Sequence, residues 1–172
     1  VNNHVIAAYT VTSNNRNVPN VPLIQLQMMQ AVPMPEDGRF VTFSVGMAAA
    51  NCKRLNPSVN NLFEPAIDFY LIKDLNQSTA TPTSSVPNTN LVKLNNAPAN
   101  PCEDTSGAKP YVVNGNTIYA AQIFGDKPIL LTGNSVAMQF VNQTSATNGN
   151  DGAFDNIQIQ DVTPQLDKTY TA

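Results

Sequence analysis

Three oxygen-bearing residues near the end of the chain, Asn150, Asp151 and Asp155, could bind a metal ion. Calcium takes six to eight oxygen ligands, and carboxylates and amides are common donors. If the closing strand alternates regularly, Asp155 points to the same side as Ile157 and Ile159. A carboxylate among core residues needs a cation, a salt bridge or several backbone N–H donors. Asp155, Asp151 and Asn150 are therefore the candidate ligands of a structural calcium ion.

Two simpler roles remain open for the same side chains. Asp155 could accept hydrogen bonds from backbone N–H groups, or pair with Arg39 or a lysine. Asp151 and Gly152 could form a turn and nothing more.

The two cysteines, Cys52 and Cys102, each lie beside turn residues. They could form a disulfide, remain as reduced thiols, or include a reactive thiol. A zinc site of the usual ligand spacing cannot be built, because the one histidine, His4, is far away in the sequence. We predict a disulfide, which would contribute about 4 kcal/mol for a loop of this length. Such a bridge would also place the protein outside the reducing cytosol.

The sequence gives little support for catalysis. A nucleophilic triad needs a base, and His4 lies near a terminus. Glycoside hydrolysis needs two facing carboxylates, and the spacing of the acids pairs none of them. The acids considered are Glu36, Glu64, Asp68, Glu103, Asp104 and Asp126. We predict that the protein is not an enzyme.

Short strands are the elements that would position these residues. Residues 39–49 alternate most clearly, and residues 66–73 are apolar on both faces, as in a central strand. Asn114-Gly115 between β-forming residues predicts a two-residue hairpin. Pro33 and Pro35 are expected to break the pattern of the second strand. The expected strands are residues 4–12, 21–30, 39–49, 66–73, 91–94, 111–113, 117–124, 127–131 and 135–142, with a last strand from about residue 153.

Many short strands without helical periodicity predict an all-β fold, an antiparallel β-sandwich with jelly-roll topology. We expect one jelly-roll domain over residues 1–163, followed by a linker over residues 164–172. Pro164 ends the last strand, and no internal repeat is visible.

The composition excludes several kinds of partner. Of the 172 residues, 42% are hydrophobic, which is enough for a core, and only 12% are charged. A net charge of -3 with nine scattered basic residues disfavours nucleic acid. No apolar run approaches the roughly 20 residues that span a bilayer, and no signal-peptide pattern opens the chain. We expect no membrane insertion.

Four segments carry a resemblance to a known group of proteins. They are Ala8-Tyr9-Thr10, the segment from Arg39 through Val45 leading to Asn51-Cys52, Pro101-Cys102, and Ala153-Phe154-Asp155-Asn156-Ile157. Together they resemble the jelly-roll domains near the N-termini of large surface proteins of Gram-positive bacteria. The resemblance implies an extracellular, cell-wall-attached protein in which residues 161–168 lead to tandem immunoglobulin-like repeats.

The closing strand is also similar to that of carbohydrate-binding and galactose-binding-like modules. These often end in an Asp-Asp or Asp-Asn strand whose carboxylate holds a structural calcium ion. Only Asp155 matches that motif here, since the other calcium ligands come from an early acidic loop and no acid precedes Glu36.

The sequence thus predicts a non-catalytic extracellular domain for adhesion or ligand binding, with a host-surface protein or glycan as partner. The alternatives are a structural stalk or cap module and a calcium-containing carbohydrate-binding module. Polar loops at residues 74–90 and 142–151 are the expected recognition elements, although no ligand-binding residue can be named. Tyr9, Tyr70, Tyr111 and Tyr119 are the available sugar platforms. Lys73 is the one lysine considered for an intramolecular isopeptide bond.

Overall fold

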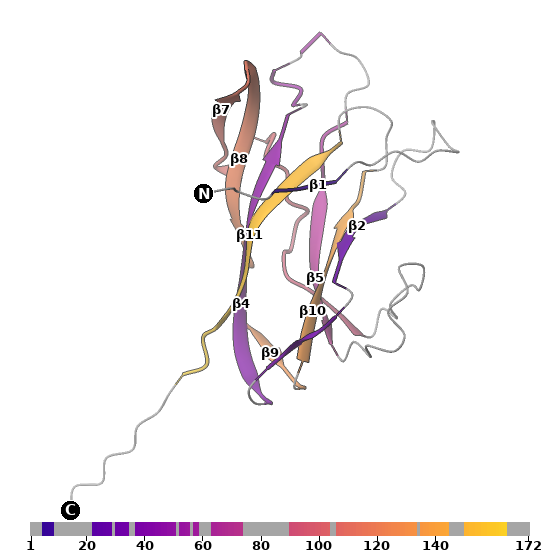
Figure 1. Cartoon of the computed structure of the whole chain (residues 1–172), viewed down its shortest axis with the longest axis vertical. Coiled ribbons are helices and arrows are strands. Elements are labelled where there is room, and N and C mark those ends of the chain that lie inside the picture. The colour runs from indigo at the N-terminus through magenta and orange to yellow at the C-terminus, as the bar shows by residue number, and fades with distance from the viewer. Residues whose placement is uncertain are drawn as a thin grey trace, which may run out of the picture.

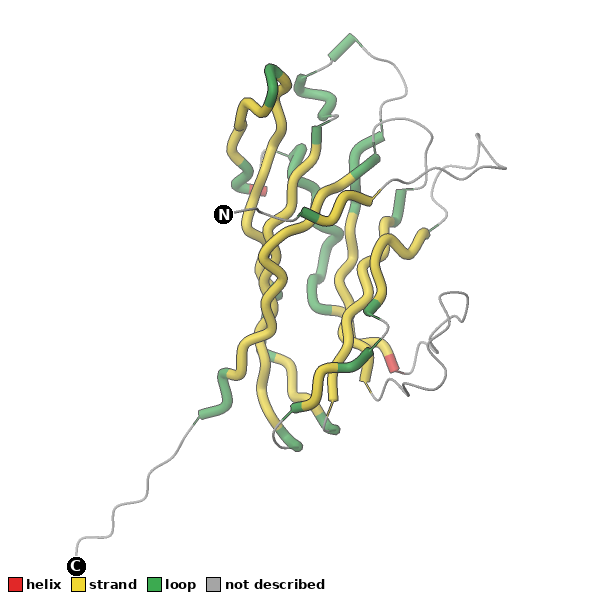
Figure 2. Tube along the Cα trace, in the orientation of Figure 1, coloured by secondary structure: helices red, strands yellow, loops and turns green. Residues whose placement is uncertain are grey.

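The computed structural model describes residues 5–8, 22–28, 30–34, 37–50, 52–55, 57–58, 63–73, 90–103, 106–133, 135–144 and 150–164. Strands and the loops between them make up nearly all of this part of the chain (Figure 2). Within it, no helix is long and apolar enough to cross a membrane.

The strands form two antiparallel sheets that face each other (Figure 1). The first sheet has the order β1-β11-β4-β8-β7, and β9 also pairs with β4; the second has the order β2-β10-β5-β6, and β3 also pairs with β10. The first sheet contains β1 (Ile6–Ala8), β4 (Arg39–Ala49), β7 (Lys109–Val113), β8 (Asn116–Phe124), β9 (Ile129–Leu131) and β11 (Gly152–Asp161). The second contains β2 (Leu23–Gln27), β3 (Val32–Pro33), β5 (Ile67–Lys73), β6 (Leu91–Lys93) and β10 (Ser135–Asn142).

The strand order is that of a jelly roll. Eight strands form the jelly roll, and in chain order they are β1, β2, β4, β5, β6, β8, β10 and β11. The first of them pairs with the last, the second with the second to last, and so on to the middle of the series. These pairs are β1 with β11, β2 with β10, β4 with β8, and β5 with β6, and all four are antiparallel. Folding such a ribbon over places the pairs in two sheets. The predicted fold class is therefore confirmed.

The core lies between the two sheets and is built around phenylalanines. Phe43 of β4, Phe69 of β5, Phe140 of β10 and Phe154 of β11 are all buried. The Phe69 and Phe140 ring centroids are 4.7 Å apart, and those of Phe140 and Phe154 are 5.1 Å apart. Both pairs meet edge to face, a favourable arrangement of aromatic quadrupoles. The Phe69–Phe140 pair joins neighbouring strands of the second sheet, whereas the Phe140–Phe154 pair joins the two sheets.

The predicted hairpin is confirmed, and strand pairing ends at Pro33. Asn114 and Gly115 both have positive φ, at 49° and 79°, and they join β7 to β8 with Val113 opposite Asn116. Pro33 is the last residue of β3, where it lies opposite Ser135 of β10, and the pairing ends there. A proline is tolerated there because β3 is a short edge strand.

The expected orientation of Asp155 was wrong. The pairing of β11 with β4 shifts between Asp155 and Gln158, and Asn156 has a φ of 50°. This bulge inserts one residue into the alternation. Phe154 and the two isoleucines of β11 therefore face the core, and Asp155 is exposed on the outer face of the first sheet.

Candidate functional site

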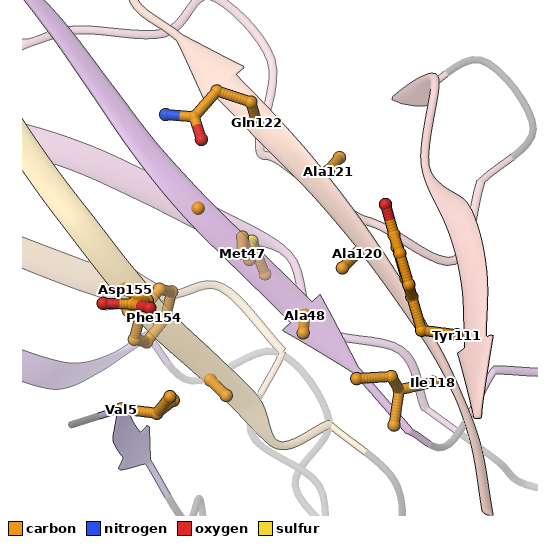
Figure 3. Close-up of a pocket in the computed structure, with 12 residues that line it drawn as sticks. Val5, Met47, Ala48, Tyr111, Ile118, Ala120, Ala121, Gln122, Phe154 and Asp155 are labelled. Atoms are coloured by element: carbon orange, nitrogen blue, oxygen red, sulfur yellow. The ribbon is translucent and has the colours of Figure 1, made fainter. Parts of the chain in front are cut away.

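The outer face of the first sheet carries a row of three residues with distinct chemistry. Asp155 of β11 lies opposite Gly46 of β4, and Gly46 lies opposite Gln122 of β8. Directly opposed residues share a face of the sheet. A carboxylate and a carboxamide therefore flank a glycine on the solvent side (Figure 3).

Small side chains next to this row leave a shallow groove in the face of the sheet. The neighbouring row runs from Ala153 through Ala48 to Ala120, so its side chains end at Cβ. At Gly46, a Cβ atom would lie 3.2 Å from the Asp155 carbonyl oxygen and 3.7 Å from Gln122 Oε1. The glycine thus keeps open the space between the two polar side chains.

Larger side chains form the walls of this groove. Tyr111 of β7 lies opposite Ile118 of β8, and both line the groove, as does Val5 from the residue before β1. The Tyr111 side chain is 52% exposed, so its ring is accessible. The groove encloses about 480 Å³, within the range of small-molecule sites. Figure 3 shows Tyr111 beside β8, with Asp155 across β4 from Gln122.

Three polar groups in this groove are available to a ligand. Asp155 Oδ1 accepts the Asn156 N–H at 2.7 Å, whereas Oδ2 has no partner among the described residues. The Gln122 amide and the Tyr111 hydroxyl likewise have none in the part of the chain that the structure describes. Gln122 donates and accepts hydrogen bonds, and Asp155 accepts them. Such a set recognises hydroxyl groups, and Asp155 is the one carboxylate among the lining residues.

The other residues proposed for calcium do not gather around Asp155. Asn150 is buried, and its side-chain amide donates a hydrogen bond to the Thr144 carbonyl. The main-chain carbonyl of Asn150 accepts a hydrogen bond from Asn142 Nδ2 at 2.8 Å. Asp151 and Asp155 are four positions apart in the chain, which corresponds to about 13 Å along an extended strand. No cluster of three or more His, Cys, Asp or Glu residues occurs among the residues described. The calcium site stays a prediction, and the geometry does not bring its three residues to one point.

The predicted disulfide between Cys52 and Cys102 is present. Both cysteines are buried, at the end of the sandwich where β4 ends and β8 begins. Arg54 lies 3.2 Å above the Tyr119 ring centroid and donates to the Pro101 carbonyl at 2.8 Å. The loops that contain the cysteines are therefore joined by the bridge and by the arginine.

A second polar cluster lies on the outer side of the second sheet, and it is internally satisfied. Asp68, 3% exposed, pairs with Lys93 at 2.9 Å and accepts from Gln143 Nε2 at 2.8 Å and from the Tyr70 hydroxyl at 3.3 Å. Burial raises the pKa of Tyr70, and the Asp68 carboxylate raises it further. Because its groups are occupied by one another, the cluster serves structure.

Several predicted features lie outside the described residues or remain untested. His4, Tyr9, residues 74–89 and 145–149, and residues 165–172 are not among those described. Lys73 is half-buried at the end of β5, and the isopeptide hypothesis stays a prediction. The groove itself was missed, although Gly46 and the small residues around it in a strongly alternating strand were a usable signal.

Comparisons with known proteins give little guidance. No family model matches the sequence, and no curated protein does. One solved structure, the EclA C-terminal domain, a sugar-binding protein, aligns with 93% of this chain and 79% of its own, at 14% identity and a TM-score of 0.43. That similarity is too distant to carry an argument about function.

Proposed function

We propose that this jelly roll is a non-catalytic, extracellular ligand-binding domain, and that its ligand is a carbohydrate bound in the outer groove of the first sheet. One observation carries the proposal: Asp155 Oδ2, the Gln122 amide and the Tyr111 hydroxyl, which have no partner among the described residues, lie around a floor of glycine and alanine.

The chemistry of the groove matches that of a sugar ring. A sugar presents C–H groups on its faces and hydroxyls around its edge. The exposed Tyr111 ring and the alanine row can pack against a face, while Asp155 and Gln122 can bind hydroxyls at the edge. The carboxylate favours a neutral sugar over an anionic one, because a second negative charge beside Asp155 would be repelled.

The setting that we propose is adhesion at the surface of a bacterial cell, where a host glycan or glycoprotein would be the partner. The buried disulfide supports an oxidising, extracellular compartment. The chain would act within a larger wall-attached protein whose immunoglobulin-like repeats hold it away from the cell. A net charge of -3 supports a partner other than nucleic acid.

A glycan array followed by titration of any hit tests the proposal. Tyr111→Ala and Gln122→Ala should each weaken binding about tenfold, since each removes a hydrogen bond or a packing surface worth about 1 kcal/mol or more. Val112→Ala is the matched control, because Val112 follows Tyr111 in β7 and is 74% exposed without lining the groove.

The negative outcomes are equally informative. Host-cell binding without any glycan hit would replace the sugar by a protein ligand. No binding in either assay would identify an architectural module. Equal losses of affinity for Tyr111→Ala and Val112→Ala would show that the groove is not the binding site.

A further inference from the structure

The first sheet leaves part of β11 without a neighbour on one side. β1 pairs with Gly152, Ala153 and Phe154, and no other described strand pairs with that edge. β4 occupies the opposite edge as far as Asp161. The second half of β11 is therefore an open edge, as Figure 1 shows where β11 descends past the short β1.

The backbone at this edge has hydrogen-bonding groups directed away from the sheet. The Val162 N–H donates to the Phe40 carbonyl at 2.8 Å. Alternate residues of an antiparallel strand direct their backbone groups to the same side. Val162 and Gln160 therefore face β4, and the N–H and C=O groups of Ile159 and Asp161 face the open side.

An apolar cleft of about 480 Å³ runs beside the open edge, between the two sheets. Its wall residues come from both sheets, and the isoleucines of β11, although they face the core, are only half-buried. The main contributors are Ile157 and Ile159 of β11, Val136 and Met138 of β10, and the nearby Met28 and Met34. Among the described residues, no strand covers this side of the cleft.

We infer that this edge binds an extended polypeptide segment, which pairs antiparallel with β11 and places apolar side chains at alternate positions into the cleft. Backbone groups that have no partner among the described strands select a polypeptide, because an alkyl chain would fill the cleft and form no hydrogen bond with Ile159 or Asp161. The unbranched methionines can adapt to different side chains. The site is separate from the sugar groove, so either proposal can fail alone.

Synthetic peptides of alternating valine and threonine, with a terminal lysine for solubility, provide the probe. In an antiparallel pair, the peptide residue opposite Ile159 has its side chain on the same face of the sheet as Ile159, and its N–H points toward the Ile159 backbone. The valines must therefore both fill the cleft and supply the hydrogen bonds. N-methylation of the valines should abolish binding, whereas N-methylation of the threonines should leave it intact.

Amide hydrogen exchange measured by NMR gives the readout. With the unmethylated and the threonine-methylated peptides, exchange at Ile159 and Asp161 should slow by about tenfold or more. No slowing, or equal slowing with the valine-methylated peptide, would overturn the inference. Protection that rises with protein concentration alone, without peptide, would also overturn it, in favour of pairing between two copies.

A pair of protein variants checks the location. Val32 is 48% exposed and lines the cleft, so Val32→Glu should abolish the protection. Val112→Glu is the control, because Val112 is a more exposed valine on β7 and does not line the cleft. This variant should leave the protection of Ile159 and Asp161 unchanged. If the two variants behave alike, the peptide does not occupy this cleft.

Discussion

At Asn156 a single backbone angle decides which chemistry β11 presents to solvent. The positive φ of 50° allows the bulge that turns Asp155 outward and keeps the isoleucines of β11 inward. Asparagine tolerates this region of φ, glycine tolerates it better, and β-branched residues do not.

Asn156→Val should therefore destabilise the protein by about 1 to 2 kcal/mol. Asn156→Gly should stay within about 0.5 kcal/mol of the parent, since the side chain that it removes is exposed and bonds only to Gln158 Nε2 in the described structure. Urea denaturation of the three proteins measures the difference. Equal midpoints for Asn156→Val and the parent would show that the bulge is not needed.

Asp161, at the end of β11, provides a prediction about pH. A hydrogen bond from the Thr163 side chain lowers the pKa of Asp161, with help from the Thr163 N–H at 2.9 Å and a smaller effect of Arg39. A lowered pKa means that the folded state binds a proton less readily than the unfolded chain. The stabilisation is complete above the usual Asp range and is lost as pH falls through the lowered value.

Thr163→Val should raise the pKa of Asp161 toward its usual value, and Arg39→Gln should raise it less. An NMR titration of the Asp161 carboxyl carbon follows both. A larger change in Arg39→Gln than in Thr163→Val would show that the ion pair, 3.6 Å long, is the dominant cause.

At the scale of elements, the β7–β8 hairpin holds Tyr111, which forms one wall of the outer groove of the first sheet. Its turn requires φ of 79° at Gly115, where an added Cβ would meet no atom within 4 Å. Any cost of Gly115→Ala therefore comes from the backbone alone, and we expect a loss of about 1 kcal/mol. Asn114→Gly should be nearly neutral, because glycine accepts the same conformation. Thermal melting compares the two variants, and identical losses would contradict this account.

Elements fixed by local pattern could be predicted from the sequence, and those fixed by distant strands could not. The alternation over residues 39–49 and the Asn114-Gly115 turn depend on neighbours in the chain, and both predictions were confirmed. The bulge at Asn156 and the pairing of Pro33 depend on partners far away in sequence. The groove was missed for the same reason, since Asp155, Gly46 and Gln122 become neighbours only through the register of three strands.

At the scale of the whole molecule, the resemblance of the closing strand and the observed positions of the three residues lead to opposite expectations about calcium. The positions of Asn150, Asp151 and Asp155 give no common centre, so we expect the melting temperature to be the same in EDTA and in excess calcium. A ligand that binds only the folded state raises the melting temperature, and the increase grows with the concentration of that ligand. A higher midpoint in calcium would restore the site and would require ligands beyond these three residues.

The disulfide has the largest predicted effect on the whole domain. It closes a separation of 50 residues that includes β5 and β6 of the second sheet and links the end of β4 to the loop before β7. In the chain-entropy description, a loop of that length contributes about 4 kcal/mol by restricting the unfolded state. The Cys52→Ala, Cys102→Ala double variant should lose about that much stability in chemical denaturation, with a further loss from the small cavity. Since both sulfurs are buried, the folded parent should resist mild reductant and yield only when partly unfolded. If the parent and the double variant melt together under non-reducing conditions, the bridge does not stabilise the domain, and the packed core between the sheets accounts for its stability.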